Sequence, residues 1–285
     1  MSSGATPSVR ARLVLCVIDG ALLGLFMSSV GVFAALMYAP ESPVLRLFPG
    51  ELARRALMGL AMGLTAIGLI YSPLGGRSGA HMNPAVTIAY VRLGRIRPAL
   101  AAGYIAGQLA LGTLGVVAIG LVVGPWFTDA PVRYAPTVPG KFGVAAAFAA
   151  ELAMTFTLML ILLIVSNTKR LAAYTPVFAG LMVFLYITIE APVSGMSINP
   201  ARTLASAIAS GEFSAIWVYL TAPVLGMLAA AELYTRLPRL PAVHCCKLNH
   251  LRHEACVHCG CDGPIDFVAH ASPSRNEPTN GGKQP

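Results

Sequence analysis

Six long apolar stretches, separated by short polar segments, dominate the chain. A helix needs about 20 predominantly apolar residues to cross a bilayer, and each stretch meets or nearly meets that length. The pattern therefore predicts six transmembrane helices, with both termini on one side of the membrane. The stretches cover about residues 13–38, 52–72, 98–123, 142–165, 174–190 and 214–236.

One short motif interrupts this pattern twice. It reads Ser-Gly-Ala-His-Met-Asn-Pro-Ala-Val-Thr over residues 78–87, the first box, and Ser-Gly-Met-Ser-Ile-Asn-Pro-Ala-Arg-Thr over residues 194–203, the second box. Asparagine caps helices well and proline is favoured at the first helical position, so each box predicts a helix start. About ten helix-compatible residues follow, and a helix of that length rises about 15 Å, half of a hydrocarbon core of about 30 Å. The starts are Asn83, Pro84 and Ala85 in the first box and Asn199, Pro200 and Ala201 in the second.

Two such half-helices that meet tip to tip would cross the core, and the chemistry of their meeting point suits neutral solutes. Asn83 and Asn199 would lie there with their side-chain amides free to donate hydrogen bonds, and both half-helices would point their positive dipole ends at the same spot. A cation would be repelled, whereas a neutral hydrogen-bonding solute would not. A single Asn-Pro-Ala is most simply an ordinary capped helix, but two copies 116 residues apart (199 − 83) argue for a pore centre.

Composition defines the class of protein. Of the 285 residues, 56% are hydrophobic and 11% are charged, which is too apolar for an ordinary soluble domain. The net charge of +8 comes from basic residues in short loops and at the termini, without a basic stripe interleaved with aromatic residues, so no nucleic-acid partner is predicted. The sequence contains no nucleophile-base pair or phosphate-binding loop that would indicate an enzyme.

The basic residues also predict the orientation. Four groups of them fall on the face that carries the termini, and the positive-inside rule makes this face cytoplasmic. Arg54 and Arg55 lie on the opposite face and are the main exception, offset in part by Glu51. We therefore expect a multi-pass protein of the plasma or inner cell membrane with both termini in the cytoplasm. The four groups are Arg10 and Arg12; Arg92, Arg95 and Arg97; Lys169 and Arg170; and Arg236 and Arg239.

At the two boxes the chain resembles the aquaporin family, also called the major intrinsic proteins, and the resemblance covers about residues 12–237. It implies an all-α membrane fold with six transmembrane helices plus two re-entrant half-helices in two inverted repeats, over about residues 13–123 and 142–236. It further implies a homotetramer with one pore per subunit. The expected parts are a cytoplasmic N-terminal segment (1–12), the channel domain (13–237), with an external linker at 124–140, and a cytoplasmic tail (238–285).

Arg202, directly after the second Asn-Pro-Ala, is the charged residue expected beside the pore. In the family this arginine forms the external constriction with one residue from the second span, one from the fifth and one from the second-box loop. Ile187 and Met196 match the fifth-span and loop positions, and Met62 is our choice for the second span, with Gly63 as the alternative. This predicted filter lacks the histidine of strict water channels, so we expect a more apolar opening that is accessible to larger or less polar solutes. Other positions differ in what the resemblance implies: Thr203, Ala207 and Tyr219 resemble water channels and Leu220 resembles glycerol channels, so the sequence leaves the solute open.

Two acidic residues lie inside apolar stretches, Asp19 in the first and Glu151 in the fourth. A charge at a helix centre costs about 2.5–3.5 kcal/mol on insertion scales, so each should have buried partners. In the family a glutamate at this place in each half accepts hydrogen bonds from the loop that carries the half-helix. Glu151 matches that pattern, and the shorter Asp19 approximates it. Gln108 in the third span matches a structural position, and His81 is expected to be structural or to line the pore.

The tail changes in composition from His244 onward. Cys256 and Cys259 have the two-residue gap of a zinc knuckle, and further thiols and imidazoles crowd around them. Thiolates in a reducing cytosol favour a metal over disulfides, so the tail predicts a site for a soft metal such as zinc, although conduction requires no cofactor. The alternatives are a disordered tail with incidental thiols, as expected beyond Gly263, or reversible oxidation. The candidate ligands are Cys245, Cys246, His250, His253, Cys256, His258, Cys259 and Cys261.

The resulting hypothesis is a passive channel in the lipid bilayer for water, extending to glycerol or another small neutral solute such as a metalloid hydroxide. A secondary transporter is the alternative from another class, and it would need a proton relay or coupling-ion ligands near the midplane. A channel linked to a metal or metalloid and regulated by the tail is a further alternative. A non-conducting structural protein would have no need for intact Asn83, Asn199 and Arg202.

Overall fold

The computed structural model describes residues 8–249, 256, 258 and 259, and within them every regular element is a helix. Six of the described helical segments are long and apolar enough to cross a membrane, which confirms the six predicted spans. Their ends lie within four residues of the predicted ends. The spans are α1 (Val9–Tyr38), α3 (Glu51–Tyr71), α6 (Pro98–Val123), α8 (Gly143–Ser166), the 3-10 turn η1 (Ala172–Tyr174) continued by α9 (Thr175–Ile189), and α12 (Ile216–Arg236).

The largest difference from the predicted bounds is at the start of α1, which begins at Val9 rather than at residue 13. The Ser8 hydroxyl caps the helix by accepting a hydrogen bond from the Ala11 amide at 3.2 Å. Because a capped first turn tolerates polar side chains, Arg10 and Arg12 lie inside the helix rather than before it.

Short helices carry and precede the two boxes. The half-helices α5 (Pro84–Arg92) and α11 (Pro200–Ser210) begin at the two prolines, as predicted. Each box also follows a short helical turn that the sequence analysis did not predict, α4 (Pro73–Ser78) and α10 (Ala191–Ser194). The remaining short helices are α2 (Pro43–Leu47) and α7 (Pro125–Thr128).

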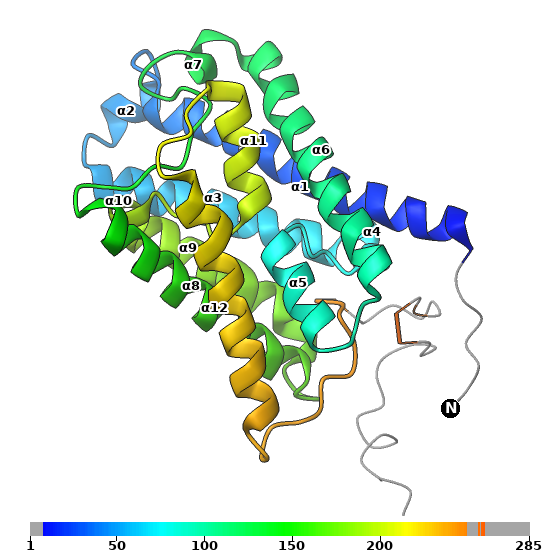
Figure 1. Cartoon of the computed structure of the whole chain (residues 1–285). Helices are drawn as coiled ribbons and strands as arrows, with labels where there is room; N and C mark the ends of the chain where they lie inside the picture. The colour runs from blue at the N-terminus through cyan, green and yellow to red at the C-terminus, as the bar shows by residue number, and fades with distance from the viewer. Residues whose placement is uncertain (1–7, 250–255, 257, 260–285) are drawn as a thin grey trace, which may run out of the picture.

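Three closely packed helix pairs build the bundle (Figure 1). In the first half α1 lies along α6, in the second half α8 lies along α12, and α3 packs on α9 to join the halves. Glycines permit these contacts: a Cβ atom added at Gly20 would lie 2.3 Å from the Gly107 carbonyl oxygen, and one added at Gly63 would lie 2.6 Å from that of Gly180.

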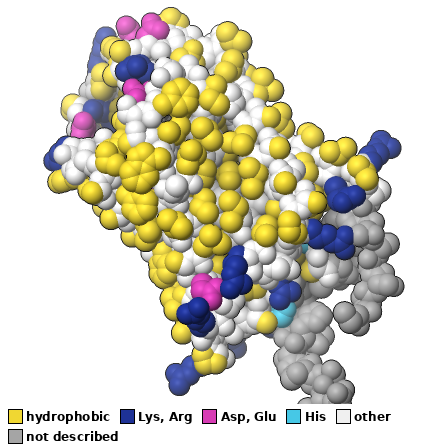
Figure 2. All heavy atoms as spheres, in the orientation of Figure 1, with side chains coloured by type: hydrophobic (Ala, Val, Ile, Leu, Met, Phe, Trp, Pro, Cys, Tyr) yellow, Lys and Arg dark blue, Asp and Glu magenta, His cyan; other side chains and the backbone are white. Residues whose placement is uncertain are grey.

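The bundle has two ends. The tail face carries the starts of α1, α6 and α9 and the ends of α3, α8 and α12, and residues 237–249 continue from it (Figure 1). The Tyr71 hydroxyl donates to the Ala173 carbonyl there at 2.7 Å. The opposite end is the far face. Figure 2 shows hydrophobic side chains over the middle of the visible surface, with charged side chains gathered toward the two ends. This distribution is that of a multi-pass membrane protein.

Candidate functional site

The two boxes start their half-helices in the same way. Asn83 and Asn199 both have extended backbones and cap the helices that follow. The Asn83 Oδ1 atom accepts a hydrogen bond from the Ala85 amide at 2.9 Å, and the Asn199 Oδ1 atom accepts one from the Ala201 amide at 3.0 Å. With a proline at the first helical position, each box begins its helix as abruptly as the sequence predicts.

The two boxes are hydrogen-bonded to each other tip to tip. The Asn83 Nδ2 atom donates to the Ile198 carbonyl at 2.8 Å, and the Asn199 Nδ2 atom donates to the Met82 carbonyl at 2.7 Å. This arrangement corrects the expectation that both amides are free, because each gives one N–H to the opposite box. A side-chain amide has two N–H groups, so each asparagine retains a second donor.

The backbone before each asparagine lies in the left-handed region, which non-glycine residues seldom adopt. Ala80 and Met82 have φ of 54° and 48°, and Met196 and Ile198 have φ of 52° and 51°. Such conformations cost about 1–3 kcal/mol each and persist only where the surroundings hold them. The strained loops therefore need anchors.

Two buried carboxylates provide these anchors. Asp19 Oδ1 accepts from the His81 amide at 2.9 Å, and Oδ2 accepts from the Met82 amide at 3.0 Å. Glu151 Oε1 accepts from the Ser197 amide and Oε2 from the Ile198 amide, both at 2.7 Å. The shorter aspartate thus makes the same pair of backbone contacts as the glutamate.

Gln108 and His81 complete the support of the first box. Gln108 Nε2 donates to Asp19 Oδ2 at 2.7 Å and to Thr87 Oγ1 at 3.2 Å. The His81 ring is buried, with Nδ1 3.1 Å from Thr87 Oγ1 and Nε2 2.9 Å from the Cys246 carbonyl oxygen. It also stacks on Tyr90, with 5.2 Å between ring centroids. His81 lines the central cavity as well, so both predicted aspects of its position occur together.

A cavity of about 940 Å³ passes between the halves, and both asparagines line it. Arg54 and Glu212 border it toward the far face, and Ile70 and Leu248 border it toward the tail face. The four predicted filter residues all line this cavity as well. They are Met62, Ile187, Met196 and Arg202.

Gly63, the alternative to Met62, lies elsewhere. It packs against the backbone of α9 near Gly180, whereas Met62 is 1% exposed and lines the cavity. The distinction follows from helical geometry, because neighbouring residues of a helix point about 100° apart.

The loop over residues 124–140 was expected to be a plain linker, and this prediction is wrong. It contributes Val132, Arg133 and Val138 to the cavity wall. Arg202 Nη1 donates to the Thr137 hydroxyl, and the Thr137 side chain is buried. The loop thus positions the arginine. Nothing in the local sequence marked Thr137, because its partner lies 65 residues further along the chain.

The same is true of the hydrogen bonds that two tyrosines make to the boxes, which the sequence analysis did not predict. The Tyr104 hydroxyl donates to the Ser78 carbonyl at 2.7 Å, and the Tyr219 hydroxyl donates to the Ser194 carbonyl at 2.6 Å. Both side chains are fully buried. Only an alignment of the α6 sequence with the α12 sequence would have shown that the two halves carry tyrosines at matching positions.

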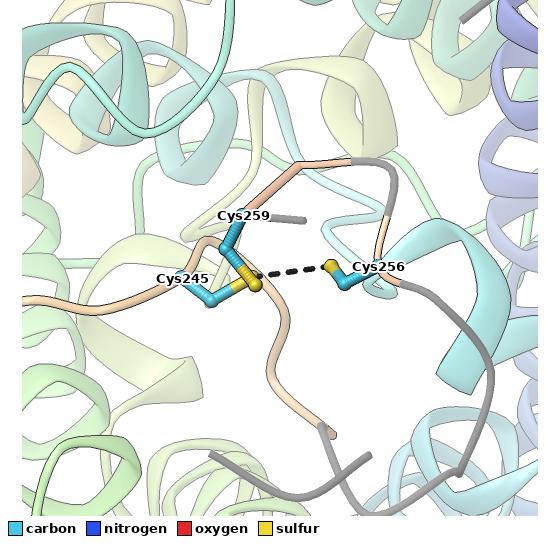
Figure 3. Close-up of side chains that lie close together, drawn as sticks. All are labelled: Cys245, Cys256 and Cys259. Atoms are coloured by element: carbon cyan, nitrogen blue, oxygen red, sulfur yellow. Dashed lines mark hydrogen bonds between the residues drawn. The ribbon is translucent and has the colours of Figure 1, made fainter. Parts of the chain in front are cut away.

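The tail brings together three of the predicted metal ligands. The sulfur atoms of Cys245, Cys256 and Cys259 lie within 4.8 Å of one another (Figure 3). Cys246 is buried but does not belong to this group, and the His258 Nε2 atom lies 3.3 Å from the Ser78 carbonyl oxygen. His250, His253, Cys261 and the expected disordered segment beyond Gly263 lie outside the described residues.

Comparisons with known proteins agree with this architecture. The family model described as "Major intrinsic protein" matches residues 17–234. The chain is 37% identical over 177 residues to aquaporin NIP6-1 of Arabidopsis thaliana, covering 62% of this chain and 56% of that protein. It is 33% identical over 188 residues to nodulin-26 of Glycine max, covering 66% of this chain and 65% of that protein. The matched region thus spans less than two thirds of the length of these relatives.

A solved structure shares the fold. The X-ray structure of the aquaglyceroporin from Plasmodium falciparum superposes with a TM-score of 0.65 at 22% identity, covering 79% of this chain and 96% of that chain. At that identity the likeness concerns the fold alone. The paired boxes, the six spans and the family match together place the chain in the major intrinsic protein family, whose members are membrane channels of the aquaporin type and not enzymes.

Proposed function

We propose that the chain is a passive membrane channel for water and small neutral solutes, and that it excludes protons and ions. The observation that carries this proposal is the meeting of two capped half-helices, cross-bonded by Asn83 and Asn199, on the wall of a cavity bordered from both faces. Two helix N-termini create a positive potential there, which disfavours cations. The remaining amide donors suit a solute that accepts hydrogen bonds. The relatives named aquaporin support the same function.

We further propose that Met62, Ile187, Met196 and Arg202 form the selectivity filter. All four line the cavity, and three of them are apolar. Arg202 is held by Thr137 rather than pointing to the surface. A filter with one charged group and an otherwise apolar wall offers few hydrogen-bond donors to water. The same wall can contact the carbon chain of a larger solute such as glycerol, so glycerol fits the proposal.

A secondary transporter fits less well. Asp19 and Glu151 each accept hydrogen bonds from two backbone amides and a serine hydroxyl of a box, and Glu190 accepts one from the Ser194 hydroxyl. Carboxylates with these partners anchor the boxes, and protonating them would break the anchors.

We also propose that the tail face is cytoplasmic and that the protein is a homotetramer. Arg92, Arg97, Lys169 and Arg236 lie near that face, in keeping with the positive-inside rule. The tetramer rests on family membership.

Stopped-flow light scattering on vesicles that contain the purified full chain, with a metal chelator present, tests the function. Sucrose and then glycerol serve as the osmotic challenge, with protein-free vesicles as the control. We expect faster shrinkage than in the control vesicles in both solutions, and re-swelling only in glycerol. Water and glycerol permeabilities equal to those of the control vesicles would refute the channel.

A matched pair of variants tests the filter. Ile187→His adds bulk and a donor to the cavity wall, so glycerol permeability should fall relative to water permeability, by about tenfold for a change of 1.4 kcal/mol in the barrier. Ile187→Val keeps the wall aliphatic and should retain the ratio of the parent protein. An unchanged ratio in Ile187→His would remove Ile187 from the filter.

A further inference from the structure

The tail packs into the tail-face opening of the cavity. We call residues 243–249 the mouth segment. Five of its residues are each at most 6% exposed: Val243, Cys245, Cys246, Leu248 and Asn249. Leu248 lines the cavity itself. This burial is that of a core segment rather than of a solvated tail.

Hydrogen bonds join the mouth segment to the first box and to the turn before it. The Leu248 amide donates to the Gly79 carbonyl at 3.1 Å, and Lys247 Nζ donates to the Gly76 carbonyl at 2.9 Å. The Cys246 carbonyl oxygen lies 2.9 Å from His81 Nε2, two residues before Asn83. The mouth segment is therefore bonded to the loop that forms one half of the proposed pore centre.

The three thiols stand beside this segment. Cys245 belongs to it, and Cys256 and Cys259 come from the chain that follows. The Cys245 and Cys256 sulfur atoms are 3.6 Å apart, and Figure 3 shows all three side chains converging. Cys245 and Cys256 are 5% and 3% exposed.

The spacing suits a metal ion. Two thiolates bound to one tetrahedral zinc ion at about 2.3 Å lie about 3.8 Å apart, close to the distance between Cys245 and Cys256. A disulfide would use two of the three thiols at about 2.05 Å and leave the third unused. Thiolates are soft ligands that select zinc or monovalent copper over magnesium or calcium.

We propose that Cys245, Cys256 and Cys259 bind a soft, thiolate-preferring metal ion, and that the bound ion holds the mouth segment over the tail-face opening of the channel. The second part rests on the proposed channel function. The ligands lie together while the mouth segment is docked, and an ion that binds this form more tightly than an undocked one stabilises it by mass action and lowers permeability. A tetrahedral ion takes its fourth ligand from solvent or from another donor of the chain.

Zinc binding to the purified full chain tests the site without reference to conduction. Competition with a chromophoric chelator should show one tightly bound zinc per chain, and Cys259→Ser and Cys259→Ala should each weaken it by at least about tenfold. Cys16→Ser is the matched control, because Cys16 lies in α1 against Gly103 and Gly107 and should leave binding unchanged. Equal binding in all of these variants, or a disulfide among the three cysteines with no zinc bound, would overturn the site.

Water permeability of vesicles in zinc and in chelator then tests the coupling. We expect permeability about twofold or more lower in zinc for the parent and for Cys16→Ser, and no difference for Cys259→Ser. Zinc binding without a change in permeability would overturn the proposed effect of the ion on the channel, but the metal site itself would stand. In a third outcome, the purified chain binds zinc tightly in the titration, but vesicles that contain it are no more permeable in chelator than protein-free vesicles. That result would refute the proposed channel and the coupling, and the metal site would stand.

Discussion

The first and second boxes are built alike and covered differently. In each box, a buried carboxylate accepts hydrogen bonds from the backbone amides of the two residues before the asparagine. A buried tyrosine hydroxyl donates a hydrogen bond to the carbonyl of the serine that starts the box. The first box then lies under the mouth segment, and the second lies under the loop over residues 124–140.

The boxes also differ in several side chains on the cavity wall, among them the one that follows Asn-Pro-Ala. Val86 follows the first Asn-Pro-Ala and Arg202 follows the second, and both line the cavity. The anchors are thus duplicated, whereas the covers and these side chains are not. This contrast indicates that the scaffold and the selectivity of the channel can be altered separately.

The largest expected effect is on the shared anchors. Asp19→Ala leaves three donors without an acceptor and Glu151→Ala leaves two, because Gln108 Nε2 still donates to Thr87 and the Ser194 hydroxyl still donates to Glu190. At about 1–3 kcal/mol for each buried unsatisfied donor, both variants should lose roughly 3 kcal/mol or more. Thermal unfolding of the purified chain in detergent measures the loss. Asp19→Asn and Glu151→Gln keep one acceptor and should lose less, and alanine variants as stable as the parent would contradict the anchoring role.

A second prediction converts one box toward the other. Arg202→Val gives the second box the side chain of the first and removes the charge held by Thr137. Glycerol permeability should rise by about tenfold, because the charged guanidinium group of Arg202 no longer narrows the opening. Re-swelling of vesicles in glycerol measures it. Val86→Ala is the control in the first box, and an equal rise in both variants would mean that the constriction is not specific to the second box.

The covers of the two mouths provide a third, smaller test. Leu248→Ala trims the mouth segment where it borders the cavity, so water permeability in chelator should rise by about twofold. Val138→Ala makes the matched change in the loop at the other mouth. Shrinkage rates of vesicles compare the two. A drop in permeability for Leu248→Ala would contradict a covering role.

The smallest effect concerns a support that we find in the first half. Gln108→Leu removes the hydrogen bond to Asp19 Oδ2, but it also removes the Gln108 Oε1 atom, which is buried without a partner. The net loss of stability should be only about 1 kcal/mol. Gln108→Glu sets a second carboxylate beside Asp19 and should lose more in the same unfolding measurement. Equal stabilities of the two variants would show that the contact between residue 108 and Asp19 does not depend on the charge of residue 108.

Much of the fold could be predicted from the sequence because its signals are local. Apolar length determines the spans, and an asparagine followed by a proline determines where each half-helix begins. The candidate filter was reachable only because the family resemblance supplied its positions, and its role stays a prediction. The short turns α4 and α10 were missed because helices of four to six residues leave no periodic pattern.

The sequence by itself therefore determined a six-span membrane protein with two capped half-helices and a cluster of soft ligands in its tail. Only the tertiary structure decided that each asparagine amide bonds to the opposite box, that Thr137 holds Arg202, and that the mouth segment lies on the first box. These contacts join residues 65 to 169 positions apart. Helix packing brings them together, and no local pattern of polarity records which distant partner a buried polar group will find.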